Sequence, residues 1–270
     1  MKRYFIVNDC RDLIKEITKE QYENYKIFNK KIEEYSNIFD CLINLQRSEI
    51  VIDNYLKDIS KNKQKTINEI YTDCKFIFLI NIMFGRILID NIKAYCKKIN
   101  RRDLIKYIHK VEKKDEIKML NVLRNFGQHY ALPFSNLKIK EDLINDKTTI
   151  DFLINLKIIK NSSNLNRADK NYVNKLREKE ISISTYYKMW MTCLNEVFIK
   201  IRNDFSDRND KLINSLLSNL FSEYLNIEDE NLVQGITEIE GDSINFLIPL
   251  DMIPVNFTLI KNLINNKQMN

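Results

Sequence analysis

The residue types best suited to chemistry lie in one short segment, Arg124-Asn125-Phe126-Gly127-Gln128-His129. Histidine is the only side chain whose unperturbed pKa lies near neutral pH, so His129 is a candidate general acid or base. Arginine presents a planar fork of N–H donors that matches a phosphate group. Together they suit a phosphodiester, with Arg124 binding the phosphate and stabilising added negative charge while His129 moves a proton.

Helical spacing gives these residues a defined relation. Asn125 and His129 are four residues apart and share a face if the segment is helical, so the amide can orient the imidazole ring or contact a ribose or phosphate oxygen. Arg124 lies about 7.5 Å from His129 along the axis, at roughly 1.5 Å per residue, and its side chain can fold back. Alternatively, Arg124 and His129 are basic groups at the negative end of a helix dipole.

Other polar residues are candidates for substrate contacts. Gln128 and Tyr130 flank His129, and a basic cluster between two predicted helices can follow RNA phosphates or simply end a helix; it comprises Lys97, Lys98, Arg101 and Arg102. The second histidine, His109, lies in a basic segment, and we expect it to be an ordinary surface or packing residue. At helical spacing, Tyr186, Tyr187 and Trp190 favour core packing over base stacking.

Composition narrows the classes of protein. The chain has 270 residues, of which 44% are hydrophobic and 30% charged, as in globular proteins. Only 4 residues are glycine and 3 proline, and the glycines are scattered, which argues against the glycine-rich loops of dinucleotide-binding and P-loop proteins. The net charge of +6 suits a polyanionic partner, although solvated lysines alone can produce it.

Cysteine usage and hydropathy predict a cytoplasmic protein. The 5 cysteines are far apart with no CxxC pair, so we expect reduced thiols, no metal site and no cofactor. No signal peptide is visible. The most apolar run, residues 76–85, is about half as long as a membrane span, so no membrane association is expected.

Hydrophobic periodicity predicts a mainly α fold. The central predicted helix is apolar nearly all round and should be covered on every side, with Arg86 and Asp90 pairing at its edge. Helices are expected over residues 9–33, 35–60, 64–99, 103–113, 115–131, 169–180, 184–204 and 208–226.

Strand patterns interrupt the helices at two places. Alternating and β-branched residues predict a β-hairpin or flap near 137–160, and short strands near 236–240 and 244–248. We therefore expect an N-terminal amphipathic helix over 1–34 that packs on a helical bundle over 35–205 with a β-flap. A short mixed extension with a helix and strands should follow over 206–270.

The motif resembles a known family. Arg-Asn-x-x-x-His, on a helix that follows a long apolar helix, is similar to the R-x4-6-H signature of the HEPN superfamily, in which the residue after the arginine is commonly Asn, Asp or His. The flanking Leu123-Arg-Asn-Phe-Gly-Gln-His-Tyr-Ala-Leu-Pro also resembles bacterial HEPN-like proteins. The resemblance covers about residues 35–205 and is specific over about ten of them.

This resemblance implies a helical bundle whose two copies form one composite site in a homodimer. It implies metal-independent cleavage of RNA by the ribose 2′-OH, leaving a 2′,3′-cyclic phosphate and a 5′-OH. Carried onto this chain, Arg124 holds the phosphate, His129 is the general acid or base, and Asn125 orients. Many relatives are toxins or effectors of antiviral defence and abortive infection, so an antitoxin or defence partner is expected.

One departure concerns regulation. In HEPN toxins paired with nucleotidyltransferase antitoxins, a tyrosine usually stands two residues after the histidine, whereas here Tyr130 follows His129 directly. Two alternatives to a nuclease stay open: a catalytically silent HEPN-like module that binds RNA, a nucleotide or a partner protein, and a helical scaffold with an incidental motif.

Overall fold

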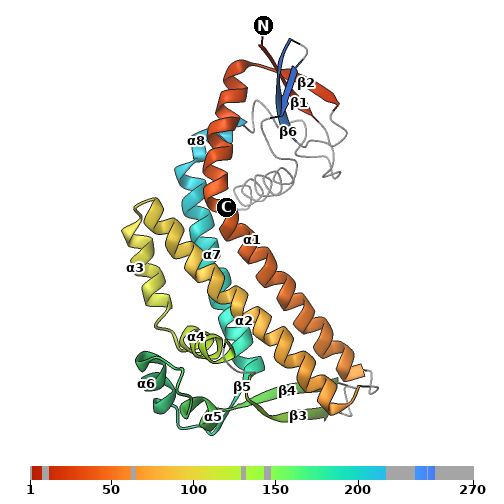
Figure 1. Ribbon diagram of the computed structural model, residues 1–270, viewed down its shortest axis with the longest axis vertical. Helices are drawn as coiled ribbons and strands as arrows, with labels where there is room; N and C mark the ends of the chain where they lie inside the picture. Colours follow the sequence, from red (N-terminus) through yellow and green to blue (C-terminus); the bar gives the residue numbers. More distant parts are fainter. Residues whose placement is uncertain are drawn as a thin grey trace. The chain divides into compact units, whose positions relative to one another are not determined.

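The computed structural model describes residues 2–7, 12–61, 65–128, 132–142, 147–216, 235–241 and 243–246. Helices predominate among them and are accompanied by two small antiparallel sheets (Figure 1), which confirms the mainly α prediction. The chain divides into two compact units, one formed by residues 1–39 with 200–270 and the other by residues 40–199.

The N-terminal prediction is wrong in two respects. Strands β1 (Lys2–Val7) and β2 (Leu13–Ile17) precede the first helix, where a helix from residue 9 was expected. β1 pairs on its other edge with β6 (Gly235–Glu240), a partner so distant in sequence that local periodicity cannot reveal it. One continuous helix, α1 (Lys19–Lys61), replaces the two predicted ones, because no glycine or proline interrupts it.

The first unit contains the sheet β2-β1-β6-β7, and β7 is Ser243–Phe246. The two C-terminal strands were predicted and are confirmed. The start of α1 packs on this sheet, since the rings of Tyr22 and Tyr4 lie 4.3 Å apart and the Tyr22 hydroxyl donates to Glu238 at 3.1 Å. Of the helix predicted over 208–226, α8 (Asp210–Leu216) is described, and residues 217–234 lie outside the described part.

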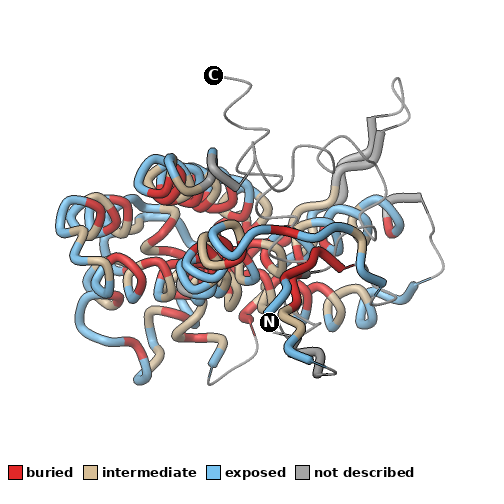
Figure 2. The backbone as a smooth tube through the Cα atoms, turned by 90° about the horizontal axis from the view of Figure 1, so that it is seen from above, coloured by how far each residue is buried: buried red, intermediate tan, exposed pale blue. Residues whose placement is uncertain are grey.

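The second unit is built around α2 (Ile67–Lys98), which begins with a capping box between Thr66 and Glu69. Buried positions recur along the helices, separated by exposed ones (Figure 2). Asn81, a polar residue in the apolar run, is buried between α1 and α7 (Ile183–Arg208): it accepts from Trp190 and donates to Ser48, both at 2.9 Å. Its hydrogen bonds explain how an amide is tolerated in the core.

The expectation that α2 is covered on every side is wrong, because Phe76 is 65% exposed and Ile87 39% exposed. Tyr187 and Trp190 of α7 are buried, which confirms their packing role, whereas Tyr186 is only partly buried.

The β-flap is confirmed as an antiparallel pair. Strands β3 (Phe134–Asp142) and β4 (Lys147–Asn155) place Leu137 opposite Phe152, and a third strand, β5 (Glu180–Ser182), was missed. Residues 156–160 are helical as α5 (Leu156–Lys160), which shortens the predicted flap.

The remaining helices of the second unit are α3 (Arg102–Val111), α4 (Asp115–Gly127) and α6 (Arg167–Lys175). The predicted helix over 115–131 begins where expected and ends at Gly127. A Cβ on Gly127 would stand 2.5 Å from Cδ1 of Leu79, so the glycine lets the end of α4 approach α2 closely. This close approach accounts for Gly127.

Candidate functional site

Arg124 and Asn125, at the end of α4, are joined to a carboxylate that the sequence did not suggest. Arg124 Nη1 donates to Asn125 Oδ1 at 2.8 Å, and Asn125 Nδ2 donates to Asp169 Oδ2 at 2.6 Å. Asn166 Nδ2 donates to the same oxygen at 2.8 Å. We call Arg124, Asn125, Asn166 and Asp169 the Arg124 cluster.

Asp169 anchors this cluster from α6. Asn166 is the N-cap of α6, and its side-chain oxygen accepts from the Asp169 amide at 2.9 Å. The side chain of Asp169 is buried, and this burial raises its pKa above the ordinary value, opposed by the hydrogen bonds from Asn125 and Asn166 and by the charge of Arg86. Asn166-x-x-Asp169 is visible as a helix start, but nothing local indicates that it meets α4.

The hydrogen bonds change the role expected of Asn125. Its oxygen faces Arg124 and its nitrogen faces Asp169, so the amide holds the guanidinium in place. Within the described residues, then, Asn125 orients the arginine rather than an imidazole ring.

The guanidinium of Arg124 has hydrogen-bond donors and a positive charge that no described side chain satisfies. Its Nε is buried and has no hydrogen-bond partner among the described residues. Its Nη1 donates to the neutral amide of Asn125, and no described carboxylate forms an ion pair with the guanidinium. A buried donor without a partner calls for a functional or structural explanation, and an anionic ligand supplies one.

The other motif residues are placed less fully. His129 and Tyr130 lie outside the described residues. The prediction that Asn125 and His129 share one face of the helix therefore lies outside them as well. Gln128 is exposed, and its backbone N–H donates to the carbonyl of Arg124 at 3.0 Å as α4 ends.

The predicted basic cluster is not brought to Arg124. Lys97 and Lys98 end α2, whereas Gly127 packs beside Leu79 on the same helix. Lys97 is 18 residues beyond Leu79, which corresponds to about 27 Å at roughly 1.5 Å per residue. Arg101 is committed to Asp103 by a hydrogen-bonded ion pair of 2.7 Å, which lowers the pKa of that carboxyl.

A second arginine lies on α2 near the Arg124 cluster and has a different environment. Nε and Nη2 of Arg86 donate to Asp90 at 3.1 and 2.6 Å, as predicted for this pair. Nη1 donates to Glu112 at 3.1 Å and to Asn121 at 2.9 Å. Lys93 also donates to Glu112, so we call Arg86, Asp90, Lys93, Glu112 and Asn121 the Arg86 cluster.

Glu112 and its neighbours define the electrostatics of that cluster. Burial of Glu112 raises its pKa, but hydrogen bonds from Lys93, His109 and Arg86 outweigh this and leave the pKa lowered. His109 is 55% exposed and lies 3.1 Å from Glu112, which places it at the surface, as expected.

The chain has no match among known protein families, characterised proteins or solved structures. In the part of the chain that the structure describes, no three His, Cys, Asp or Glu side chains are grouped so as to hold a metal ion. No helix within the described ranges is long and apolar enough to cross a membrane. Among the described cysteines, Cys41, Cys74, Cys96 and Cys193 are thiols rather than members of disulfides.

Proposed function

We propose that this protein is a metal-independent endoribonuclease of the HEPN type. The observation that carries the proposal is the state of Arg124, whose side chain is held by Asn125 and Asp169 while its charge meets no described carboxylate. A preorganised guanidinium with free donors suits the charge that develops on a phosphodiester during cleavage. The resemblance of Arg124-Asn125-x-x-x-His129 to the HEPN signature supports the same reaction.

In the proposed reaction, Arg124 binds the scissile phosphate and stabilises the added negative charge on its oxygens. The ribose 2′-OH loses its proton to a general base as the bond between O2′ and phosphorus forms. The bond from phosphorus to the 5′-oxygen then breaks, and a general acid protonates that oxygen. His129 is the candidate for one of these proton transfers, and the products are a 2′,3′-cyclic phosphate and a 5′-OH.

One copy of the motif leaves the second proton transfer without an assigned group. We therefore propose that a homodimer brings two copies of Arg124 and His129 together in one composite site. The HEPN resemblance also suggests a cytoplasmic toxin or antiviral effector, controlled by an antitoxin or defence-system partner protein.

The test is cleavage of a fluorescent single-stranded RNA in the presence of EDTA. The wild-type protein should cut the RNA, leave a 2′,3′-cyclic phosphate, and fail to cut a 2′-O-methyl RNA of the same sequence. His129→Ala should abolish cleavage and relieve toxicity on expression in bacteria. Tight binding of RNA without any cleavage would instead support the silent module, and cleavage of the 2′-O-methyl RNA would refute the proposed mechanism.

A further inference from the structure

The exposed side of α3 carries a row of cations that the Arg124 cluster does not use. The buried side of this helix consists of Leu104, Ile108 and Val111. The opposite side, which we call the α3 basic face, continues into the following turn and consists of Arg102, Lys106, Lys110 and Lys113, all exposed. Their spacing of four, four and three residues puts them on one side of the helix, over about 16 Å at roughly 1.5 Å per residue.

The charge of the α3 basic face is not neutralised by its surroundings. In the described ranges none of its four side chains has an ion pair or a hydrogen bond. The nearby acids are occupied, because Asp103 is held by Arg101 and Glu112 by Lys93 and Arg86. Four positive charges therefore face solvent together.

The helix dipole does not explain this row. Cations are favoured in the last turn of a helix, which fits Lys110 and Lys113. Arg102 is the first residue of α3, where the dipole is positive and disfavours a cation. The basic face therefore extends along the whole length of α3, including the end at which the helix dipole disfavours a cation.

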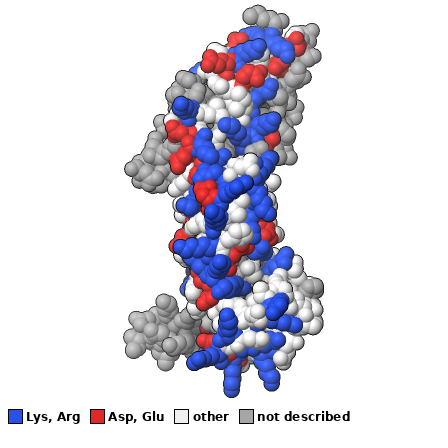
Figure 3. Space-filling model, turned by 90° about the vertical axis from the view of Figure 1, so that its left-hand side faces the viewer, with Lys and Arg blue, Asp and Glu red and all other residues white. Residues whose placement is uncertain are grey.

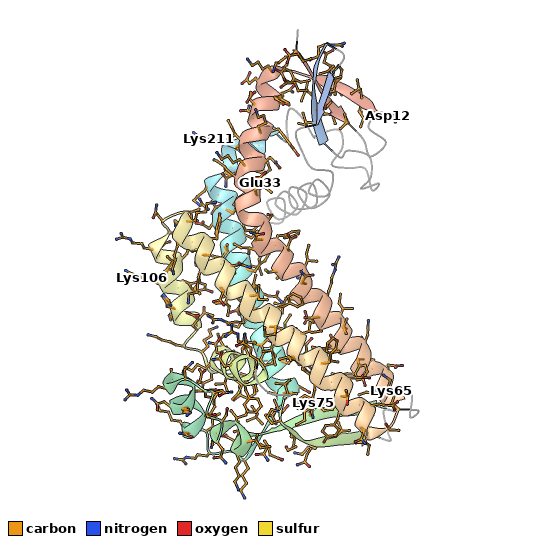
Figure 4. The ribbon with its side chains drawn as sticks, in the orientation of Figure 1. Asp12, Glu33, Lys65, Lys75, Lys106 and Lys211 are labelled. Atoms are coloured by element: carbon orange, nitrogen blue, oxygen red, sulfur yellow. The ribbon has the colours of Figure 1, made fainter. Side chains whose placement is uncertain are left out.

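The basic face adjoins the helix that carries Arg124. Glu112 follows α3 directly and bonds to Arg86, and Arg86 bonds to Asn121, which lies one turn before Asn125 on α4. Lys106 points outward from α3 in Figure 4. Figure 3 shows many blue Lys and Arg side chains, with red Asp and Glu side chains among them, on the face of the molecule that it draws.

We propose that the α3 basic face binds the phosphate backbone of the RNA whose scissile phosphate meets Arg124; the choice of RNA among polyanions rests on the proposed function. A row of unpaired cations on one helix face binds a polyanion through counterion release and needs no particular sequence. The sequence singled out Lys97, Lys98, Arg101 and Arg102 as the basic surface. Of these only Arg102 belongs to the α3 basic face.

The test measures RNA binding separately from cleavage. The full chain carries Arg124→Met, so that the RNA is not consumed, and fluorescence anisotropy with a labelled single-stranded RNA gives Kd at several KCl concentrations. The test pair is Lys106→Gln with Lys110→Gln. The matched control is Lys75→Gln with Lys188→Gln, which removes the same charge from unpaired lysines on α2 and α7 of the same unit.

The test pair should weaken binding about 10-fold near 0.1 M salt and reduce the salt slope by about 1.4, since each lost contact to a single strand removes about 0.7. The control pair should change the slope by less than half as much. An unchanged slope, or equal effects of the two pairs, would overturn the inference.

Competition distinguishes RNA from an acidic protein. Polyglutamate at equal charge should compete weakly, and equal competition would point to an acidic polypeptide and overturn the assignment of RNA. If the wild type cuts RNA while the test pair binds RNA normally, the inference fails and the proposed function stands. If the wild type is inert but the test pair loses binding, the proposed function fails and the basic face stands as an RNA-binding surface.

Discussion

Arg86 and Arg124 lie in the same unit, and each contacts an asparagine of α4, yet their environments are opposite. Every nitrogen of the Arg86 guanidinium donates a hydrogen bond, and two carboxylates, Asp90 and Glu112, neutralise its charge. Arg124 donates from Nη1 to Asn125, and its Nε is buried without a partner among the described residues. Asp169 is reached only through Asn125.

This difference separates a structural arginine from a candidate functional one. A saturated, neutralised guanidinium stabilises the contacts among α2, α3 and α4 and has little left for a ligand. A guanidinium that is oriented by a neutral amide keeps its charge for an anion that arrives later. Substitutions at the two arginines should therefore affect different properties of the protein.

The largest expected effect is that of Arg124→Lys on RNA cleavage. Lysine keeps the charge but loses the planar fork that contacts both Asn125 and a phosphate, so the rate should fall about 10³-fold, or about 4 kcal/mol. Arg86→Lys should leave the rate within about 3-fold of the wild type at a temperature where both are folded. Single-turnover cleavage measures both, and wild-type activity of Arg124→Lys would remove the distinction.

Stability should respond in the reverse order. Arg86→Met removes the ion-pair partner of Asp90 and one of the partners of Glu112, which keeps Lys93, so the free energy of unfolding should fall by about 2 kcal/mol. Arg124→Met removes an unsatisfied buried donor and should change it by less than about 1 kcal/mol. Urea denaturation followed by circular dichroism gives both values, and equal losses would show that the two arginines have the same structural role.

The two asparagines of α4 provide a matched pair. Asn125→Ala frees the Arg124 guanidinium and should lower kcat about 10²-fold. Asn121→Ala removes one of several contacts to Arg86 and should change kcat by less than about 3-fold. Steady-state kinetics with RNA distinguishes them, and similar kcat values for the two variants would count against a positioning role for Asn125.

Substitutions at Asp169 should have the smallest effect on kcat, and that effect should depend on whether an oxygen acceptor is kept. Asp169→Ala removes the acceptor for Asn125 and should lower kcat about 10-fold, whereas Asp169→Asn keeps an oxygen acceptor and should restore most of the rate. Failure of Asp169→Asn to restore it would mean that the negative charge itself is required.

The stability of Asp169→Asn should also depend less on pH. Burial raises the pKa of Asp169 above 3.8, its ordinary value, so the folded state binds this proton more tightly than the unfolded chain does. The free energy of unfolding therefore falls as the pH rises from 3.8 through the raised pKa. Asp169→Asn lacks this contribution, and denaturation across that range should show a flatter profile than the wild type.

Local sequence patterns predicted the elements whose formation depends on residues near one another in the sequence. Periodicity located most helices of the second unit, and spacing picked out Arg124 with Asn125. Asp169 escaped prediction because it stands 44 residues from Asn125 and meets it only when α6 packs on α4. The strands β1 and β2 escaped for the same reason, since β1 depends on pairing with β6.

Charge was visible in the sequence, but its pairing was not. Four basic residues at the junction of α2 and α3 formed the obvious cluster, yet Arg101 is bonded to Asp103. The unpaired cations run instead along the outer side of α3, which only the burial of its opposite side reveals.

The most direct test of the central claim is cleavage of single-stranded RNA in EDTA by wild type, Arg124→Met and Arg86→Met, each checked for folding in the same preparation. Arg124→Met should be as folded as the wild type and at least about 10³-fold slower, while Arg86→Met should be less stable but cut RNA when folded. Cleavage by folded Arg124→Met at the wild-type rate would contradict the assignment of Arg124 to the scissile phosphate.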